Sequence, residues 1–91
     1  MELMYKNIFL GKIEITERES FWISGNFYPN PEASEFKSFF DALVCEDGFD
    51  ESQFDEDLLD ENNWYVCENG KIIGISYPAI YDDSEIGFRY R

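Results

Sequence analysis

Residues 21–31 read Phe-Trp-Ile-Ser-Gly-Asn-Phe-Tyr-Pro-Asn-Pro, and they mark the place where the chain changes from strand to helix. The aromatic-rich part, residues 21–28, suits a strand because its side chains divide between two faces, and Gly25 in its middle indicates a bulge or a close approach of another backbone. Asn30 then suits the N-cap of a helix, and Pro31 suits the first helical position, where an N–H is not needed. The stretch therefore predicts a strand that leads directly into a helix.

The helix that follows is predicted from Pro31 to about Cys45, ending near Gly48. Its apolar side chains recur at the spacing of one helical face, which would lie on the core. These apolar residues are Phe36, Phe39, Phe40, Leu43 and Val44.

Before this segment, Met4–Glu17 reads as two short strands. Polar and apolar residues alternate strictly from Lys12 to Thr16, as in a strand with one face in water. Gly11 tolerates the positive φ of a tight turn, so the sequence predicts a hairpin that turns near Gly11.

The C-terminal third predicts more strands. Asn63–Glu68 and Lys71–Tyr77 flank Asn69–Gly70, the strongest hairpin signal in the chain. A loop is predicted over Ala79–Ser84 and a last strand over Glu85–Tyr90. The expected fold is α+β: an antiparallel sheet of five to six strands, with one main helix and a short second helix packed on one face.

The chain has 91 residues, 44% hydrophobic and 19% aromatic, which predicts a single folded domain over residues 1–91 rather than a disordered acidic tail. The N-terminus lacks the pattern of a signal peptide, and no run of about 18 apolar residues could span a bilayer. We therefore expect a cytoplasmic protein.

The most acidic segment is residues 46–61, where nine of sixteen residues are acidic and none is basic. The whole chain carries a formal charge of −13. Four apolar residues in the run, Phe49, Phe54, Leu58 and Leu59, are spaced for a short helix that Asp50 or Ser52 could cap, with Gln53 in the capping-box position after Asp50. A loosely held, solvated loop is the alternative.

Several kinds of chemistry are disfavoured. The chain has no histidine, the carboxylates show no pair that a cleft would select, and Asp55–Asp60 does not fit a calcium-binding loop. Cys45 and Cys67 are too few for a disulfide framework; we expect buried free thiols, with a bridge between the two as the alternative. We therefore expect no enzyme activity, no cofactor and no specific metal site. Negative charge also disfavours binding to nucleic acid or to an anionic membrane.

Four segments resemble small bacterial immunity proteins of contact-dependent inhibition and other polymorphic toxin systems. They are Ile8–Glu14, Phe21–Pro29, the Phe-rich helix and Ile86–Tyr90. The resemblance implies a protein that binds a cognate toxin domain, often a nuclease, and blocks it in the producer's cytoplasm. It implies no particular contact residue, since such contacts differ from toxin to toxin.

The charge pattern itself predicts contact with a basic protein surface, because an acidic field speeds encounter and aromatic anchors then set affinity. Besides an immunity protein, three interpretations stay open: a phage-type anti-defence inhibitor or DNA mimic, a weak metal-binding or enzymatic role, and a solvated face that only aids solubility. The oligomeric state is not predicted. The expected contact residues are Asp47, Asp50, Glu51, Asp55, Glu56, Asp57, Asp60, Glu61, Tyr81, Asp82, Asp83 and Glu85.

Overall fold

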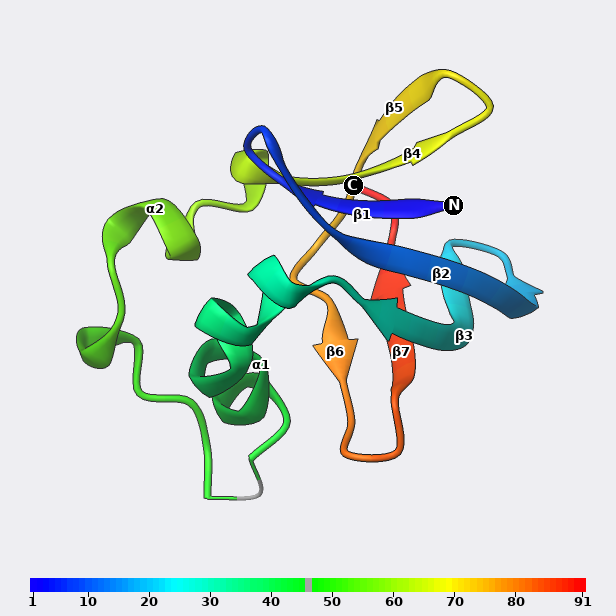
Figure 1. Cartoon of the computed structure of the whole chain (residues 1–91). Helices are drawn as coiled ribbons and strands as arrows, with labels where there is room; N and C mark the ends of the chain where they lie inside the picture. Colours follow the sequence, from blue (N-terminus) through cyan, green and yellow to red (C-terminus); the bar gives the residue numbers. More distant parts are fainter. Residues whose placement is uncertain (46) are drawn as a thin grey trace.

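The computed structural model describes residues 1–45 and 47–91 and shows an α+β fold. Seven antiparallel strands form one curled sheet, a half-barrel, in the order β5-β4-β1-β2-β3-β7-β6 (Figure 1). The strands are β1 Glu2–Tyr5, β2 Ile8–Glu19, β3 Trp22–Pro29, β4 Trp64–Glu68, β5 Lys71–Gly74, β6 Ala79–Ile80 and β7 Glu85–Arg89.

The long strand β2 lies at the centre of the sheet and is interrupted by two bulges. Leu10 is the extra residue against β1, and Thr16 is the extra residue against β3. Bulges increase the right-handed twist of a strand, so they favour the curl of this sheet. Gly25 lies opposite the second bulge, where a Cβ would overlap the carbonyl oxygen of Glu14, and this confirms the predicted close approach.

The first hairpin does not turn at Gly11, so that prediction is wrong. β1 and β2 are joined at Lys6–Asn7, and Lys6 carries the positive φ, 51°. The Lys6 N–H donates to the carbonyl oxygen of Asn63 at 2.9 Å, a tertiary bond that the local sequence does not reveal. Gly11 lies within β2 instead, where a Cβ would be 2.5 Å from the carbonyl oxygen of Tyr28.

The predicted helix begins at Pro31 as expected and has 13 residues. Its first half is a 3-10 helix, η1 Pro31–Phe36, and its second half is α1 Lys37–Leu43, so it ends two residues before Cys45. Asn30 occupies the N-cap position without capping through its side chain. Its amide donates to the carbonyl oxygen of Phe9 at 3.2 Å, which fastens the start of the helix to β2.

The helix covers an aromatic core. Phe39 stacks on Trp64 of β4 with ring centroids 5.6 Å apart, while Phe36 packs beside Tyr5 of β1. The buried hydrophobic residues come from both ends of the chain and from the helix. They are Leu3, Tyr5, Leu10, Ile13, Ile23, Phe27, Ala33, Phe39, Phe40, Trp64, Val66, Ile75, Ile86 and Phe88.

The C-terminal hairpin is confirmed and the following loop is corrected. Asn69 and Gly70 have φ values of 53° and 79°, as a two-residue hairpin turn requires. β5 ends at Gly74 rather than Tyr77. Residues 79–80 were expected in a loop but form β6, whose pairing with β7 gives seven strands instead of five to six.

Two distant parts of the sheet meet where the chain leaves β5 and β7. Ile75 pairs with Tyr90, and the Arg91 side chain donates to the carbonyl oxygens of Ile75 and Trp64 at 2.7 and 3.2 Å. These bonds stabilise the curl. None of the helices that the described residues form is long and apolar enough to cross a membrane.

Candidate partner-binding surface

The acidic run forms three short turns instead of one short helix. They are η2 Glu51–Gln53, α2 Glu56–Leu59 and η3 Glu61–Asn63. The expectation of a helix is therefore confirmed only for the four residues of α2, and the other two are single 3-10 turns. Glu46, the first residue of the run, lies outside the described residues.

The run is attached to the core by its apolar residues, as the sequence predicted. The Phe54 ring contacts Phe39 edge-on at 5.2 Å, and Phe49 stacks on Phe54 at 5.5 Å. Behind α2, the Trp64 indole N–H donates to the carbonyl oxygen of Leu58 at 2.9 Å. The Tyr77 hydroxyl donates to the carbonyl oxygen of Leu59. The described part of the run is thus a structured surface and not a loosely held loop.

Two carboxylates of the run accept hydrogen bonds from backbone N–H groups. Asp50 accepts hydrogen bonds from the N–H and the hydroxyl of Ser52 at 3.1 and 2.6 Å, and the hydroxyl bond is the main reason why the pKa of Asp50 is lowered. This confirms Asp50 as a cap. Gln53 bonds to the Asp50 side chain, not to its backbone as a capping box would. Asp60 caps η3 through the N–H of Asn62 at 3.0 Å.

The carboxylates of the run face solvent with little compensation by cations. Asp57 forms an ion pair with Lys6 at 2.6 Å, and this bond raises the pKa of Lys6. No other acidic residue within residues 47–61 has an ion pair with a described residue. The exposed members are Asp47, Asp50, Glu51, Asp55, Glu56, Asp57, Asp60 and Glu61. Burial raises the pKa of nearby Tyr77, and the field of Glu61, Asp60 and Glu51 adds to that effect.

The remaining expected contact residues lie on the turn between β6 and β7 and at the first residue of β7. Tyr81, Asp82, Asp83 and Glu85 are all exposed and line a shallow depression of about 460 Å³. Asp83 shapes the turn by accepting from the N–H of Glu85 at 3.0 Å.

The β6–β7 turn and the acidic run form separate surfaces. In Figure 1, α1 lies between α2 and the β6–β7 turn. Among residues 1–45 and 47–91, no hydrogen bond or ion pair joins the two groups. The sequence-predicted residues therefore form two acidic surfaces on either side of α1.

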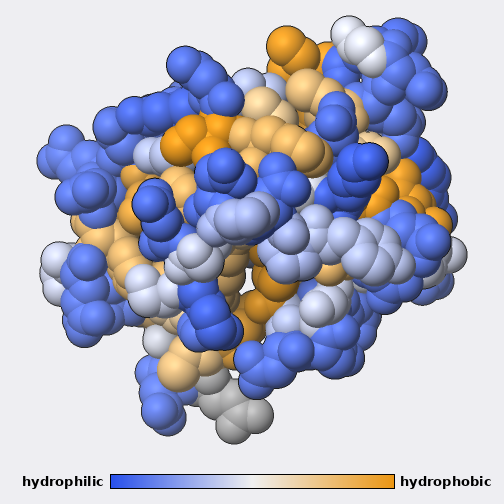
Figure 2. Space-filling view, in the orientation of Figure 1, coloured by the Kyte–Doolittle hydropathy of each residue, from blue (hydrophilic) through white to orange (hydrophobic). Residues whose placement is uncertain are grey.

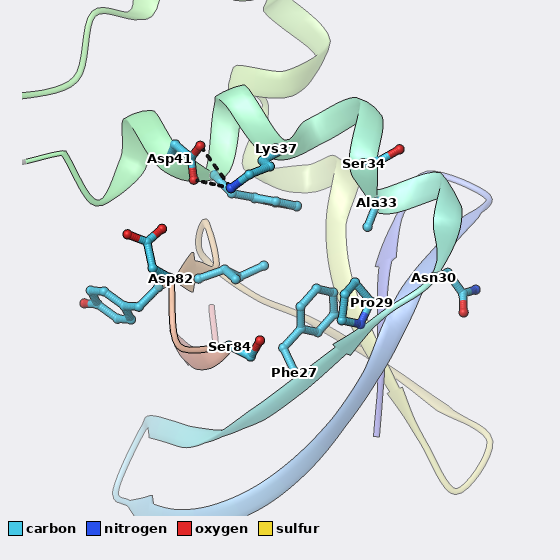
Figure 3. Close-up of a pocket in the computed structure, with 12 residues that line it drawn as sticks. Phe27, Pro29, Asn30, Ala33, Ser34, Lys37, Asp41, Asp82 and Ser84 are labelled. Atoms are coloured by element: carbon cyan, nitrogen blue, oxygen red, sulfur yellow. Dashed lines mark hydrogen bonds and ion pairs between the residues drawn. The ribbon is translucent and has the colours of Figure 1, made fainter.

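A cavity of about 320 Å³ lies between these surfaces, and no pattern in the sequence predicts it. It opens between β3, the helix and the β6–β7 turn, and Figure 2 shows a hollow near the middle of this face with apolar residues inside. Segments around residues 27–41 and 80–84 form it together, so no single stretch of sequence carries a signal for it. Its lining residues are Phe27, Pro29, Asn30, Ala33, Ser34, Lys37, Phe40, Asp41, Ile80, Tyr81, Asp82 and Ser84 (Figure 3).

The described residues contain no group of three or more metal-ligating side chains that could hold an ion. Cys45 and Cys67 are both free. The expectation of buried thiols is wrong for Cys45, which is exposed just beyond the end of α1, while Cys67 on β4 is half-buried.

Comparison of the chain with protein-family models, with curated proteins and with solved structures finds no match. The features of the described residues that bear on function are therefore the two acidic surfaces and the cavity between them.

Proposed function

We propose that this chain is an acidic immunity protein, which binds and neutralises a cognate basic toxin domain, a nuclease, in the cytoplasm of the producing cell. The observation that carries the proposal is the attachment of the acidic run to the aromatic core. The run exposes eight carboxylates within residues 47–61, and only Asp57 is paired with a cation in the described structure. The resemblance to immunity proteins indicates that the partner is a toxin domain.

Attachment matters because carboxylates packed this densely repel one another and oppose a fixed arrangement. Phe54, Leu58 and Leu59 offset this repulsion by packing on the core. A surface already ordered before binding loses less conformational entropy on association, which favours tight binding. Solubility alone needs a net charge of magnitude about 2 to 8 in a small domain, less than this chain carries.

The physical fit to a nuclease follows from charge. A nuclease binds the phosphate backbone through Lys and Arg side chains, so its substrate groove is positive. An acidic surface that covers the groove is attracted over long range and then competes with the substrate. Exposed Phe49 lies within the acidic run and exposed Tyr81 on the β6–β7 turn, and aromatic side chains commonly dominate binding energy.

Capture from a lysate of the source organism tests the proposal. The immobilised protein should retain one basic protein in stoichiometric amount, released by rising salt, and that protein should cleave nucleic acid until this chain is added. Recovery of an enzyme that binds DNA of any sequence, and competition between this chain and such DNA, would instead indicate the anti-defence inhibitor or DNA mimic. Capture of no basic protein from cells that express the toxin would contradict both proposals.

A further inference from the structure

The cavity beside α1 combines an apolar interior with an acidic rim. Buried Phe27 from β3, buried Phe40 from α1 and half-buried Ile80 of β6 all line it. At about 320 Å³ the cavity is at the lower end of the size range of small ligand sites, and can hold one side chain.

The charges at the rim leave one carboxylate without a partner. Lys37 lies 3.3 Å from both carboxylate oxygens of Asp41, one helical turn away, so these two charges offset each other. Asp82 lies on the opposite side, on the β6–β7 turn, and Figure 3 shows its carboxylate directed toward the helix. The described residues give Asp82 neither a hydrogen bond nor an ion pair.

We propose that this cavity receives an arginine side chain of the basic partner. The three methylene groups would pack between Phe27, Phe40 and Ile80, and the guanidinium would reach the Asp82 carboxylate, which it can bind with two parallel hydrogen bonds. The exposed Tyr81 ring beside Asp82 offers a face on which a guanidinium stacks. The inference rests on the proposed function for the presence of a basic partner.

Charge complementarity favours this occupant over others. A second copy of the chain would bring another −13 charge to the acidic rim, and an anionic ligand would meet the same repulsion. Lysine fits less well, because its compact ammonium is strongly hydrated and does not stack on a ring as a planar guanidinium does. A purely apolar ligand would leave the Asp82 carboxylate unpaired.

A titration followed by NMR tests the inference without the natural partner. The ¹⁵N-labelled protein would be titrated with the peptide Ac-Ala-Arg-Ala-NH2, and with its citrulline analogue, which has nearly the same shape but no charge. We expect saturable shifts of the Phe27, Phe40 and Ile80 amides with the arginine peptide and much smaller shifts with citrulline. Asp82→Asn should weaken the binding about two- to five-fold, the worth of an exposed ion pair.

Two further variants complete the test. Glu35→Gln removes the same charge from the exposed side of η1, outside the cavity, and should leave peptide affinity nearly unchanged. Ala33→Leu fills the cavity without changing charge and should abolish the shifts at Phe27 and Phe40. If Ala33→Leu does not fold, Asp82→Asn still tests the inference, because Asp82 lies on an exposed turn where the substitution should not affect folding.

The remaining outcomes overturn the inference. Equal shifts with citrulline would show an apolar pocket without a role for arginine. Shifts confined to residues 47–61, or no shifts, would show that arginine does not enter the cavity, while the proposed immunity function would stand. Conversely, specific entry of the peptide in a protein that captures no basic partner would leave the cavity assignment intact and contradict the proposed function.

Discussion

The indole N–H of Trp64 donates a hydrogen bond to the carbonyl oxygen of Leu58 at 2.9 Å, and this bond joins the first residue of β4 to the acidic run. Trp64 is fully buried and stacks on Phe39, so its ring position is fixed by the core. Because the Leu58 carbonyl oxygen is bonded to this ring, the position of α2 is fixed as well. The order of the acidic surface therefore depends on a residue that no partner could touch.

Trp64→Phe should lower the free energy of unfolding by about 2 to 4 kcal/mol, because it leaves a cavity in the core and an unpaired carbonyl at Leu58. Chemical denaturation measures the change. Trp22→Phe is the matched control, since Trp22 is 44% exposed and its indole N–H bonds only to the Ser24 hydroxyl. Equal destabilisation by the two substitutions would contradict the anchoring role of Trp64.

Gly25→Ala should destabilise the protein by about 1 to 3 kcal/mol, because the added Cβ would overlap the Glu14 carbonyl oxygen across the bulge in β2. A thermal or urea melt measures the loss. Asn26→Ala, on the other face of the same strand, removes only an exposed hydrogen bond to Glu14 and should cost much less. A Gly25→Ala protein as stable as the parent would disprove the close approach.

Ser52→Ala should raise the pKa of Asp50 toward its ordinary value, since the Ser52 hydroxyl is the main cause of its depression. A group with a depressed folded pKa stabilises the fold above its unfolded pKa of about 3.9, and this contribution is lost as pH falls through the lower folded value. NMR titration of the Asp50 carboxyl carbon measures the shift. An unchanged Asp50 pKa in Ser52→Ala would show that the cap is not formed in solution.

Much of this fold could be predicted from local patterns. The strand predicted over residues 21–28 and found at Trp22–Pro29, the helix start at Pro31, the Asn69–Gly70 turn and the Asp50 cap all depend on residues adjacent in sequence. The predictions failed where distant residues decide the conformation. Lys6, which has a positive φ, donates its N–H to the distant Asn63, and the Asn30 side chain bonds to the carbonyl oxygen of Phe9 instead of capping the helix.

In the candidate site, too, local patterns were predicted correctly and contacts between distant residues were not. The sequence predicts that Phe54, Leu58 and Leu59 attach the acidic run to the core, and the structure places them there. It could not predict that α1 lies between the run and Asp82, nor that Phe27 and Ile80 share a cavity with Lys37. Two-residue β6 was also missed, since a strand that short has no period to recognise.

Added salt should stabilise this protein, because a net charge of −13 repels itself and ions screen that repulsion. Between 10 and 300 mM NaCl we expect a rise in Tm of roughly 5 °C, equivalent to about 1 kcal/mol in a domain of this size. In Glu56→Lys/Glu61→Lys each substitution makes the net charge two units more positive, so the net charge changes from −13 to −9. The rise in Tm with salt should therefore be smaller. A Tm that falls with salt in both proteins would contradict dominant self-repulsion.

The most direct test of the acidic surface is the association rate constant with the captured basic partner at low ionic strength. Glu56→Lys/Glu61→Lys reverses two exposed charges in the run, and Glu32→Lys/Glu35→Lys makes the same change in net charge on η1. If the run meets the partner, the first variant should associate about ten-fold more slowly than the parent, and the second should be much less affected. Equal rates for the two variants would show that the position of the reversed charges does not matter and would contradict the assignment of the run as the contact surface.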